Sequence, residues 1–550
     1  MKRLCTVMTL LLVISSCNQD LDLSPRTSLS DAVFWNSPND FKLAANRYYT
    51  TLLPEHGASD ANADITYENA QNVVSAGTLI PSENDDVWTD TYRELRQINT
   101  MLAKADEYAG DASEIATSVA EGKFFRAYAY FNLVVRFGDI PYYDRPLEGA
   151  TDEGLNAPRT PRETIIAHII EDLDEAAPGL PVQSSLEGVD IGRVTQGAAW
   201  AFKARVTLFE ATWAKYHGTP GNIDDLLDQS IAAAQAVVGS GEYDLFIYDP
   251  APEESYLQSY MLPGNDSREQ ILARRHHPEI AGHAWSNWLC CGGLGDGTKK
   301  LADMYACTDG LPIDISPLFQ GYGTMTSEYE NRDRRMTNTF AIPGLNQVYR
   351  ENPDGADAVF PRLISDEETG YRVRKLIGVD QEGFIWGRNS EFKHVLRYSE
   401  VLLNLAEALF ERNGAISDGE LDATVNRLRA RGGVAPLTNA LVGANGLNML
   451  AEIRRERTIE LAYDGFRLND LRRWKTAVAE LNEHIRGVNI GNGSWDIQFP
   501  GVSAQFPTDA GGFRIVEDAS IRQFAERNYL FPLPTQQIQL SPNLRQNPGW

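Results

Sequence analysis

Residues 121–141 read Glu-Gly-Lys-Phe-Phe-Arg-Ala-Tyr-Ala-Tyr-Phe-Asn-Leu-Val-Val-Arg-Phe-Gly-Asp-Ile-Pro and decide the fold class more than any other stretch. Apolar residues recur there three and four positions apart, as on one face of a helix. That face carries Phe124, Tyr128, Phe131 and Val135. Gly138 predicts the end of the helix, and Pro141 prevents its continuation. The stretch therefore predicts a long helix with a buried aromatic stripe.

The same periodicity extends along the chain on both sides of this helix. Paired helices joined by short turns that contain Gly or Pro resemble tetratricopeptide units, so we expect a mainly α fold of stacked helical hairpins. The expected helices span Asp40–Leu53, Asp85–Tyr108, Ser113–Phe137, Pro161–Ala177, Thr195–Tyr216, Ile223–Val238, Glu391–Asn413, Asp418–Arg429 and Leu447–His484.

Two regions interrupt the helical pattern, about 249–387 and about 487–518, and both are rich in Gly, Pro, Asn and aromatic residues. Long irregular stretches within a compact body are usually functional. We therefore expect one body over residues 31–550. Its helical scaffold covers about 31–248 and 388–486, and the loop-rich insertions form the binding half, together with the loop Gly57–Asp86.

The overall charge excludes one class of partner. The 550 residues contain 50 Lys and Arg but 76 Asp and Glu, which gives a formal net charge of −26. A chain this acidic repels phosphate backbones, and no basic stripe offsets the average. No nucleic-acid partner is expected.

The N-terminus predicts export and lipidation. Lys2 and Arg3 precede a short apolar run that is too short to span a bilayer, so residues 1–16 are read as a signal peptide. Ile14-Ser15-Ser16-Cys17 resembles the lipobox of bacterial lipoproteins, in which the cysteine is acylated and becomes the first mature residue. Residues 17–30 would then be a tether. The alternative is an ordinary signal peptide with an incidental cysteine.

The remaining cysteines do not predict a disulfide framework. Cys5 lies in the signal peptide, and Cys290, Cys291 and Cys307 are an odd set. One bridge is possible in an oxidising envelope compartment, but its pairing is left open.

A search for catalytic motifs predicts no enzyme. The chain lacks Gly-x-Ser-x-Gly and His-Glu-x-x-His, and Gly292–Lys299 has the lysine in the wrong place for a phosphate loop. The cluster of His and Cys near residue 280 has no zinc spacing. Glu456 and Glu460 are four apart beside Arg457, which favours a structural ion pair. We expect no catalytic residue, no metal site and no cofactor, although a calcium ion that orders a loop stays open.

Aromatic residues in the loops favour carbohydrate. Flat rings stack on the apolar faces of sugars while amides bind hydroxyls. The candidate contacts are Trp285, Trp288, Tyr67 and Asn69, with Tyr322 and Trp386 in reserve. The alternative is that these rings only pack beneath their loops.

An ordered series of motifs resembles the SusD/RagB family of surface lipoproteins from Bacteroidetes, over essentially the whole mature chain. The series comprises Cys17–Pro25, Trp88-x-x-x-Tyr92, residues 121–141, Leu301-x-Asp-x-Tyr305, Asn331–Arg335, Arg397–Ala408, Glu456–Arg467, Asp470–Trp474 and Gln546–Trp550. Arg334 and Ser399 depart modestly from the pattern. Most of these motifs are helical, and only Cys17 carries a functional role over from the family.

The resemblance implies a function. Family members are lipid-anchored in the outer membrane, face the cell exterior and act as lids on SusC-like TonB-dependent transporters. They capture an oligosaccharide or polysaccharide, or a peptide in some members, without cleaving a bond. A peptide-binding lid is therefore the first alternative, and a surface glycosidase is a remoter one.

Overall fold

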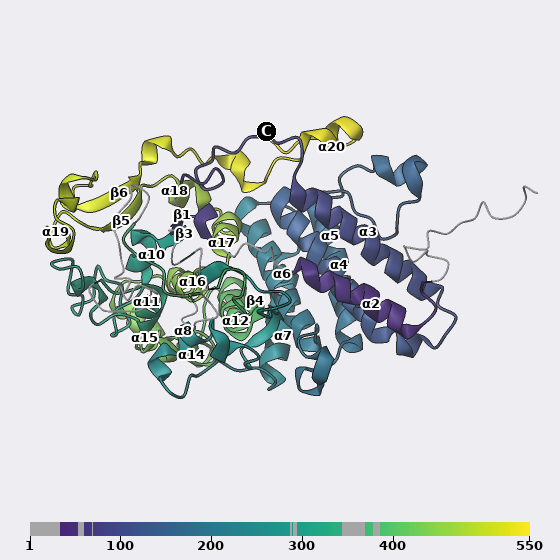
Figure 1. The fold of residues 1–550 in the computed structure, drawn as a ribbon, viewed down its shortest axis with the longest axis horizontal. Coiled ribbons are helices and arrows are strands. Elements are labelled where there is room, and N and C mark those ends of the chain that lie inside the picture. The colour runs from purple at the N-terminus through teal and green to yellow at the C-terminus, as the bar shows by residue number, and fades with distance from the viewer. Residues whose placement is uncertain are drawn as a thin grey trace, which may run out of the picture.

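The computed structural model describes residues 34–52, 60–68, 70–286, 289, 294–343, 369–377 and 385–550. The fold is mainly α, as the periodicity predicted. Figure 1 shows a helical half, on the right, and a loop-rich half, on the left, with the C-terminal segment running over both. In the part of the chain that is described, no helix is both long and apolar enough to cross a bilayer.

Long helices build the helical half. Neighbours pack as hairpins, α3 against α4, α5 against α4 and α6, and α6 against α7, while α12 and α16 extend the stack. The bounds are α2 Pro38–Tyr48, α3 Asp86–Asp106, α4 Ala116–Phe137, α5 Arg162–Ala176, α6 Gln196–His217, α7 Ile223–Gly239, α12 Tyr398–Asn413 and α16 Met449–Glu460. Helix α4 buries the aromatic stripe and ends at Gly138, whose φ of 76° favours glycine.

Besides the long helices, the described residues form short helices and three two-stranded antiparallel sheets, most of them in the loop-rich half. The sheets pair β1 with β3, β2 with β4 and β5 with β6. The strands are β1 Thr66–Glu68, β2 Gln270–Arg274, β3 Leu294–Gly297, β4 Lys393–Arg397, β5 Ile485–Asn489 and β6 Phe513–Glu517. The short helices are α8 Ser255–Gln258, α10 Lys299–Met304, α11 Arg334–Thr339, α13 Asp418–Ala423, α14 Val425–Gly432, α15 Asn439–Ala444, α17 Arg467–Arg473, α18 Ala477–Leu481, α19 Trp495–Gln498 and α20 Thr535–Leu540.

Three predicted helices have the wrong bounds. The helix expected from Glu391 begins only at Tyr398, because residues 393–397 form β4 and pair with β2. The helix expected over 418–429 divides at Thr424, whose φ of −127° and ψ of −96° are not helical. The helix expected over 447–484 becomes α16, α17 and α18, because Tyr463 and Gly465 adopt positive φ angles of 69° and 81°.

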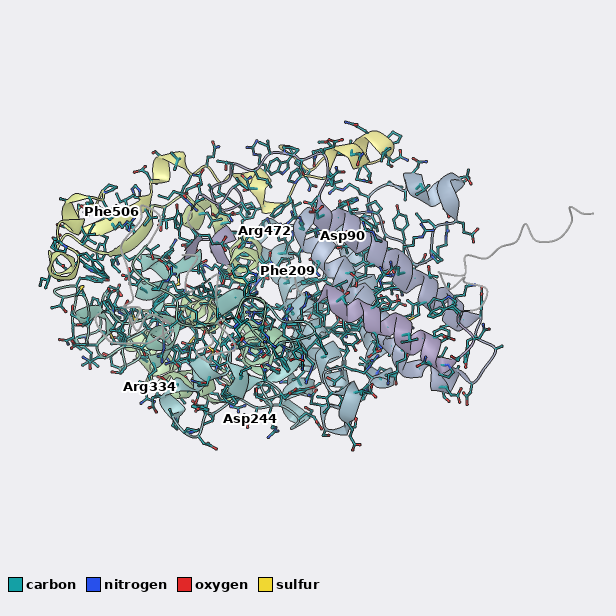
Figure 2. The ribbon with its side chains drawn as sticks, in the orientation of Figure 1. Asp90, Phe209, Asp244, Arg334, Arg472 and Phe506 are labelled. Carbon is teal, nitrogen blue, oxygen red and sulfur yellow. The ribbon has the colours of Figure 1, made fainter. Side chains whose placement is uncertain are left out.

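The described residues form two hydrophobic cores: the larger is built on the long helices and extends to α14, α17 and the β2–β4 sheet, and the smaller lies within the loop-rich half. Figure 2 places Phe209 of α6 and Arg472 of α17 at the junction. The Arg472 guanidinium is buried and donates to the carbonyl of Val135 at 2.8 Å. Because α17 is thereby tied to α4, the loop-rich half is held against the helical half.

A buried ion cluster stabilises the loop-rich half around Glu460. Its carboxylate accepts from Arg397 at 2.8 Å, from Arg431 at 2.5 Å and from Arg335 at 2.9 Å. Burial raises the pKa of this carboxyl, but the guanidinium groups outweigh burial and lower it to about 2. The carboxylate is therefore ionised at neutral pH and belongs to the scaffold.

Candidate functional site

Two loop-rich segments far apart in the sequence, residues 276–286 and 385–393, lie side by side. The His283 N–H donates to the Asn389 carbonyl, and the Asn389 N–H donates to the His283 carbonyl, both at 2.9 Å. Arg388 also pairs with Glu279 at 3.4 Å. These contacts place Trp285 and Trp386, two of the predicted ligand residues, on neighbouring segments.

Trp285 is half-buried and held by its neighbours. The ring of His283 packs edgewise against it, 5.6 Å between centroids, and the Lys393 Nζ of β4 lies over the indole. The backbone N–H of Trp285 donates to His283 Nδ1 at 3.3 Å, while His283 Nε2 donates to the Glu391 carbonyl at 3.1 Å. Burial and the positive charge of Lys393 lower the pKa of His283 to about 2, so this imidazole is neutral and fixes the indole without adding charge.

Trp386 is the most accessible of the predicted aromatic residues in the described part of the chain, with 63% of its surface exposed. Ile280 is 85% exposed and Ile385 is 48% exposed on the same pair of segments. Large apolar side chains are usually covered, and an exposed group of them typically marks a binding surface. We call Ile280, Trp285, Ile385 and Trp386 the loop surface.

Tyr67 lies on β1 and pairs with Asp296 of β3. Thr66 is buried and Tyr67 is half-buried, since neighbouring strand residues face opposite sides. Arg467 of α17 fixes the chain before β1. Its guanidinium donates to the Asp64 carboxylate at 2.8 and 2.9 Å, and its backbone N–H donates to the Asp60 carboxylate at 3.0 Å. Tyr67 is thus presented by a strand that a much later segment anchors.

Tyr322 belongs to a different surface from Trp285 and Trp386. Its hydroxyl donates to Asp303 at 3.0 Å, its ring meets Phe513 edge to face at 4.7 Å, and Lys299 lies over both rings. Burial, and then the charge of Asp303, raise the pKa of Tyr322 well above its usual value. A cavity of about 560 Å³ opens beside Lys299, Asp303 and Phe513. Tyr322 is thus held by α10 and β6, and also by the neighbouring ring of Phe319.

Several predicted residues lie outside the described part of the chain. They are Cys17, with the signal peptide and the tether, Asn69, Trp288, Cys290 and Cys291. Cys307 is described and is a buried free thiol.

Among the described residues, no three His, Cys, Asp or Glu side chains gather as metal ligands. The carboxylate pair that the sequence singled out is structural, because Glu456 and Glu460 both bind the buried Arg335. Arg126 and Arg467, which lie in the motifs of the family series, form ion pairs with Asp172 and Asp64.

Sequence reasoning missed Lys393 and Phe513, which hold two of the predicted aromatic side chains in place. Lys393 fell inside a predicted helix, and its strand signal was limited to the short apolar pair Val395-Leu396. Phe513 carried no pattern of its own, since its role comes from the pairing of β6 with β5.

The sequence matches two family profiles. The SusD family matches residues 274–550, and a family described as starch-binding and associating with the outer membrane matches residues 24–208. A curated relative, SusD-like protein P25 of Formosa agariphila, is 23% identical over 494 residues, covering 84% of this chain and 87% of its own length.

Solved structures share the fold. A SusD-like carbohydrate-binding protein of Bacteroides fragilis has a TM-score of 0.74 at 23% identity, covering 93% of this chain and all of that one. A laminarin-binding SusD-like protein has a TM-score of 0.58 at 20% identity, covering 94% of this chain and all of that one. The SusD profile alone spans half of the sequence, and the fold and the ordered motifs agree with it, so this chain belongs to the SusD/RagB family.

Proposed function

We propose that this protein captures oligosaccharide or polysaccharide at the cell surface and delivers it to a SusC-like TonB-dependent transporter, without cleaving it. In this proposal Cys17 carries the lipid that anchors the protein in the outer membrane, facing outwards. Family membership supports the proposal, as does the similarity to SusD-like proteins described as binding carbohydrate or laminarin.

The observation that carries the glycan proposal is the loop surface. Trp386 offers an exposed indole to a sugar face, and Trp285 stands on the adjoining segment with its orientation fixed by His283 and Lys393. Aromatic rings contribute stacking, and nearby polar groups exchange hydrogen bonds with hydroxyls at little net gain, so a shallow site of this kind binds weakly. Dissociation constants of about 1 μM to 1 mM are expected.

The test is a panel of purified glycans titrated into soluble protein that begins at Asn18. Trp285→Ala and Trp386→Ala, alone and together, should abolish binding to the glycan class that the wild type recognises. Trp550→Ala is a matched control, because its indole bonds the carbonyls of Arg527 and Leu530 away from the loop surface.

Three outcomes contradict parts of the proposal. Binding that survives the double substitution would move the site elsewhere. Binding only to peptides would replace the ligand class. Shortened glycan after long incubation, prevented by changing one carboxylate, would show an enzyme. Association with the transporter is tested separately, by co-purification of the lipidated protein from outer membranes.

A further inference from the structure

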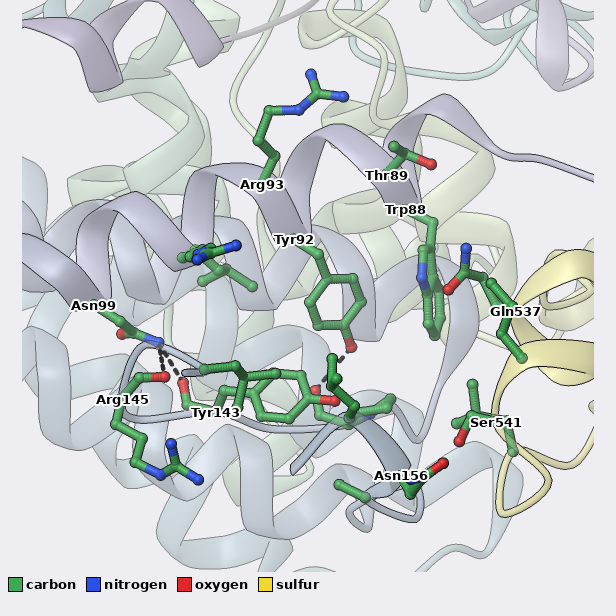
Figure 3. A pocket seen from close by; sticks show the side chains of 18 of the residues that line it. Trp88, Thr89, Tyr92, Arg93, Asn99, Tyr143, Arg145, Asn156, Gln537 and Ser541 are labelled. Carbon is green, nitrogen blue, oxygen red and sulfur yellow. Dashed lines mark hydrogen bonds between the residues drawn. The ribbon is translucent and has the colours of Figure 1, made fainter. Parts of the chain in front are cut away.

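A cavity of about 730 Å³ lies in the helical half, remote in sequence from the loop surface (Figure 3). Its walls are helix α3, the loop that follows α4 and the segment around α20. Trp88, Tyr92 and Asn99 are spaced four and seven residues apart, so they share the face of α3 that lines the cavity. This size is within the range of small-molecule sites.

One wall of the cavity is aromatic. The rings of Trp88 and Tyr92 are 4.9 Å apart, and Tyr92 is fixed by its hydroxyl, which donates to the Pro141 carbonyl at 2.8 Å. The backbone carbonyl of Tyr143 is fixed by the Asn99 amide at 2.8 Å. In Figure 3 Trp88, Tyr92 and Tyr143 stand around a shared space, and Gln537 and Ser541 enter it from the α20 side.

Polar side chains in the cavity have unused hydrogen-bonding capacity. Ser541 is only 6% exposed, yet its hydroxyl has no hydrogen-bond partner among the described residues. Buried hydroxyl groups normally have a hydrogen-bond partner, so a buried hydroxyl without one requires an explanation. A ligand that accepts from or donates to Ser541 supplies one, and the half-exposed Gln537 amide lies one helical turn away to extend the contact.

The charge of the cavity is opposite to that of the protein. Among the described residues that line it are three arginines and no Asp or Glu, although the chain has a net charge of −26. Arg93 pairs with Asp90 at 2.7 Å and Arg145 with Asp152 at 2.8 Å. Arg96 is exposed, and within the described residues it lies in no ion pair, so its charge is available to an anion.

We propose that this cavity is a second saccharide site, separate from the loop surface, and that it takes an acidic sugar. The ring packs on Trp88 and Tyr92, the sugar hydroxyls bond Ser541 and Gln537, and a carboxylate or sulfate pairs with Arg96. Aromatic walls with amide and hydroxyl groups suit a sugar, and an Arg without a carboxylate partner selects the acidic kind.

The test is calorimetric titration of soluble protein, starting at Asn18, with trigalacturonic acid and a sulfated chondroitin disaccharide as acidic probes. Maltotriose serves as the neutral probe. At least one acidic probe should bind. Arg96→Ala should weaken that binding by about 10- to 100-fold, as expected for a charge-assisted hydrogen bond. Arg47→Ala removes an exposed Arg of α2 outside the cavity and should change nothing.

Ser541→Ala separates a ligand role from a structural one. Because the hydroxyl has no partner within the described protein, its loss should leave the melting temperature equal or higher while weakening the acidic probe by about two- to tenfold. A fall in melting temperature with unchanged affinity would assign Ser541 to packing and overturn the proposal.

The remaining outcomes test the cavity separately from glycan binding at the loop surface. Folded wild type that binds neither acidic probe, or that binds maltotriose as tightly, refutes an acidic-sugar site. Acidic binding lost in Trp386→Ala and kept in Arg96→Ala assigns the ligand to the loop surface instead. If a short polyglutamate binds the cavity as tightly as the acidic sugars do, the cavity is a general anion pocket, and the acidic-sugar proposal is overturned.

Discussion

Removing the charge of Glu460 tests how the loop-rich half is held together. Glu460→Gln preserves the size of the side chain but leaves Arg335, Arg397 and Arg431 around a neutral amide. The pKa of Glu460 is about 2 in the fold against an ordinary 4.5. A difference of about 2.5 corresponds to about 3.4 kcal/mol, because each pKa unit is worth about 1.36 kcal/mol. Breaking a buried ion pair costs about 3–5 kcal/mol, so we expect Glu460→Gln to lower the free energy of unfolding by that amount at pH 7.

The pH dependence of this loss has a defined sign. Since folding lowers the pKa, the ionised Glu460 stabilises the protein fully above pH 4.5, and the stabilisation declines as the pH falls toward 2. At pH 3.5 about 1.4 kcal/mol of it is gone. The difference in free energy of unfolding between the wild type and Glu460→Gln should therefore be about 1.4 kcal/mol smaller at pH 3.5 than at pH 7.

The assay is urea unfolding followed by circular dichroism at pH 7 and pH 3.5. The control is Glu107→Gln, which breaks a surface pair with Lys104 at 2.7 Å and should cost less than about 1 kcal/mol. A Glu460→Gln variant within about 1 kcal/mol of wild type at pH 7 would refute the reasoning, as would a gap that widens at pH 3.5.

Two further substitutions test the loop surface and a buried acid. A Cβ at Gly282 would lie 2.0 Å from the Gly387 carbonyl oxygen, so Gly282→Ala should separate the two segments and weaken glycan binding by about tenfold. Gly323→Ala, which meets nothing within 4 Å, should leave binding unchanged in the same titration. Burial raises the pKa of Glu328 to about 7, so the folded state loses stability as the pH rises from 4.5 to 7. In urea unfolding, the free energy of unfolding of Glu328→Gln should rise by about 2.5 kcal/mol relative to that of the wild type between pH 5 and pH 8, and a constant difference would contradict this.

The helical scaffold could be predicted because its signals are local. The aromatic stripe from Phe124 to Val135 and the stop at Gly138 lie within one helix, and the structure confirms both. The strand Lys393–Arg397 could not be recognised, because its pairing partner Gln270–Arg274 lies far away in the sequence. A short apolar run reads equally as helix or strand when its partner is unknown.

The candidate site, too, could be predicted only in part from the sequence. Composition pointed to Trp285 and Trp386 as loop aromatics, and the structure places them on adjoining segments through the His283–Asn389 pairing, which has no local sequence signal. The cavity beside Trp88 gave no sequence signal either. Its walls come from helix α3, from the loop after α4 and from the C-terminal segment near Ser541, and only the folded chain brings these together.

The hydrogen bonds from Arg467 to Asp60 and Asp64 have a consequence for the order in which the chain folds. Arg467 lies 403 residues after Asp64, so the segment that carries Tyr67 cannot be anchored in this way until the chain has been made as far as Arg467. Contacts at such long sequence separation form late, because closing the intervening loop costs entropy first. A partly made chain can build its early helical hairpins while the strand that carries Tyr67 is still without its anchor, so this part of the fold is completed last.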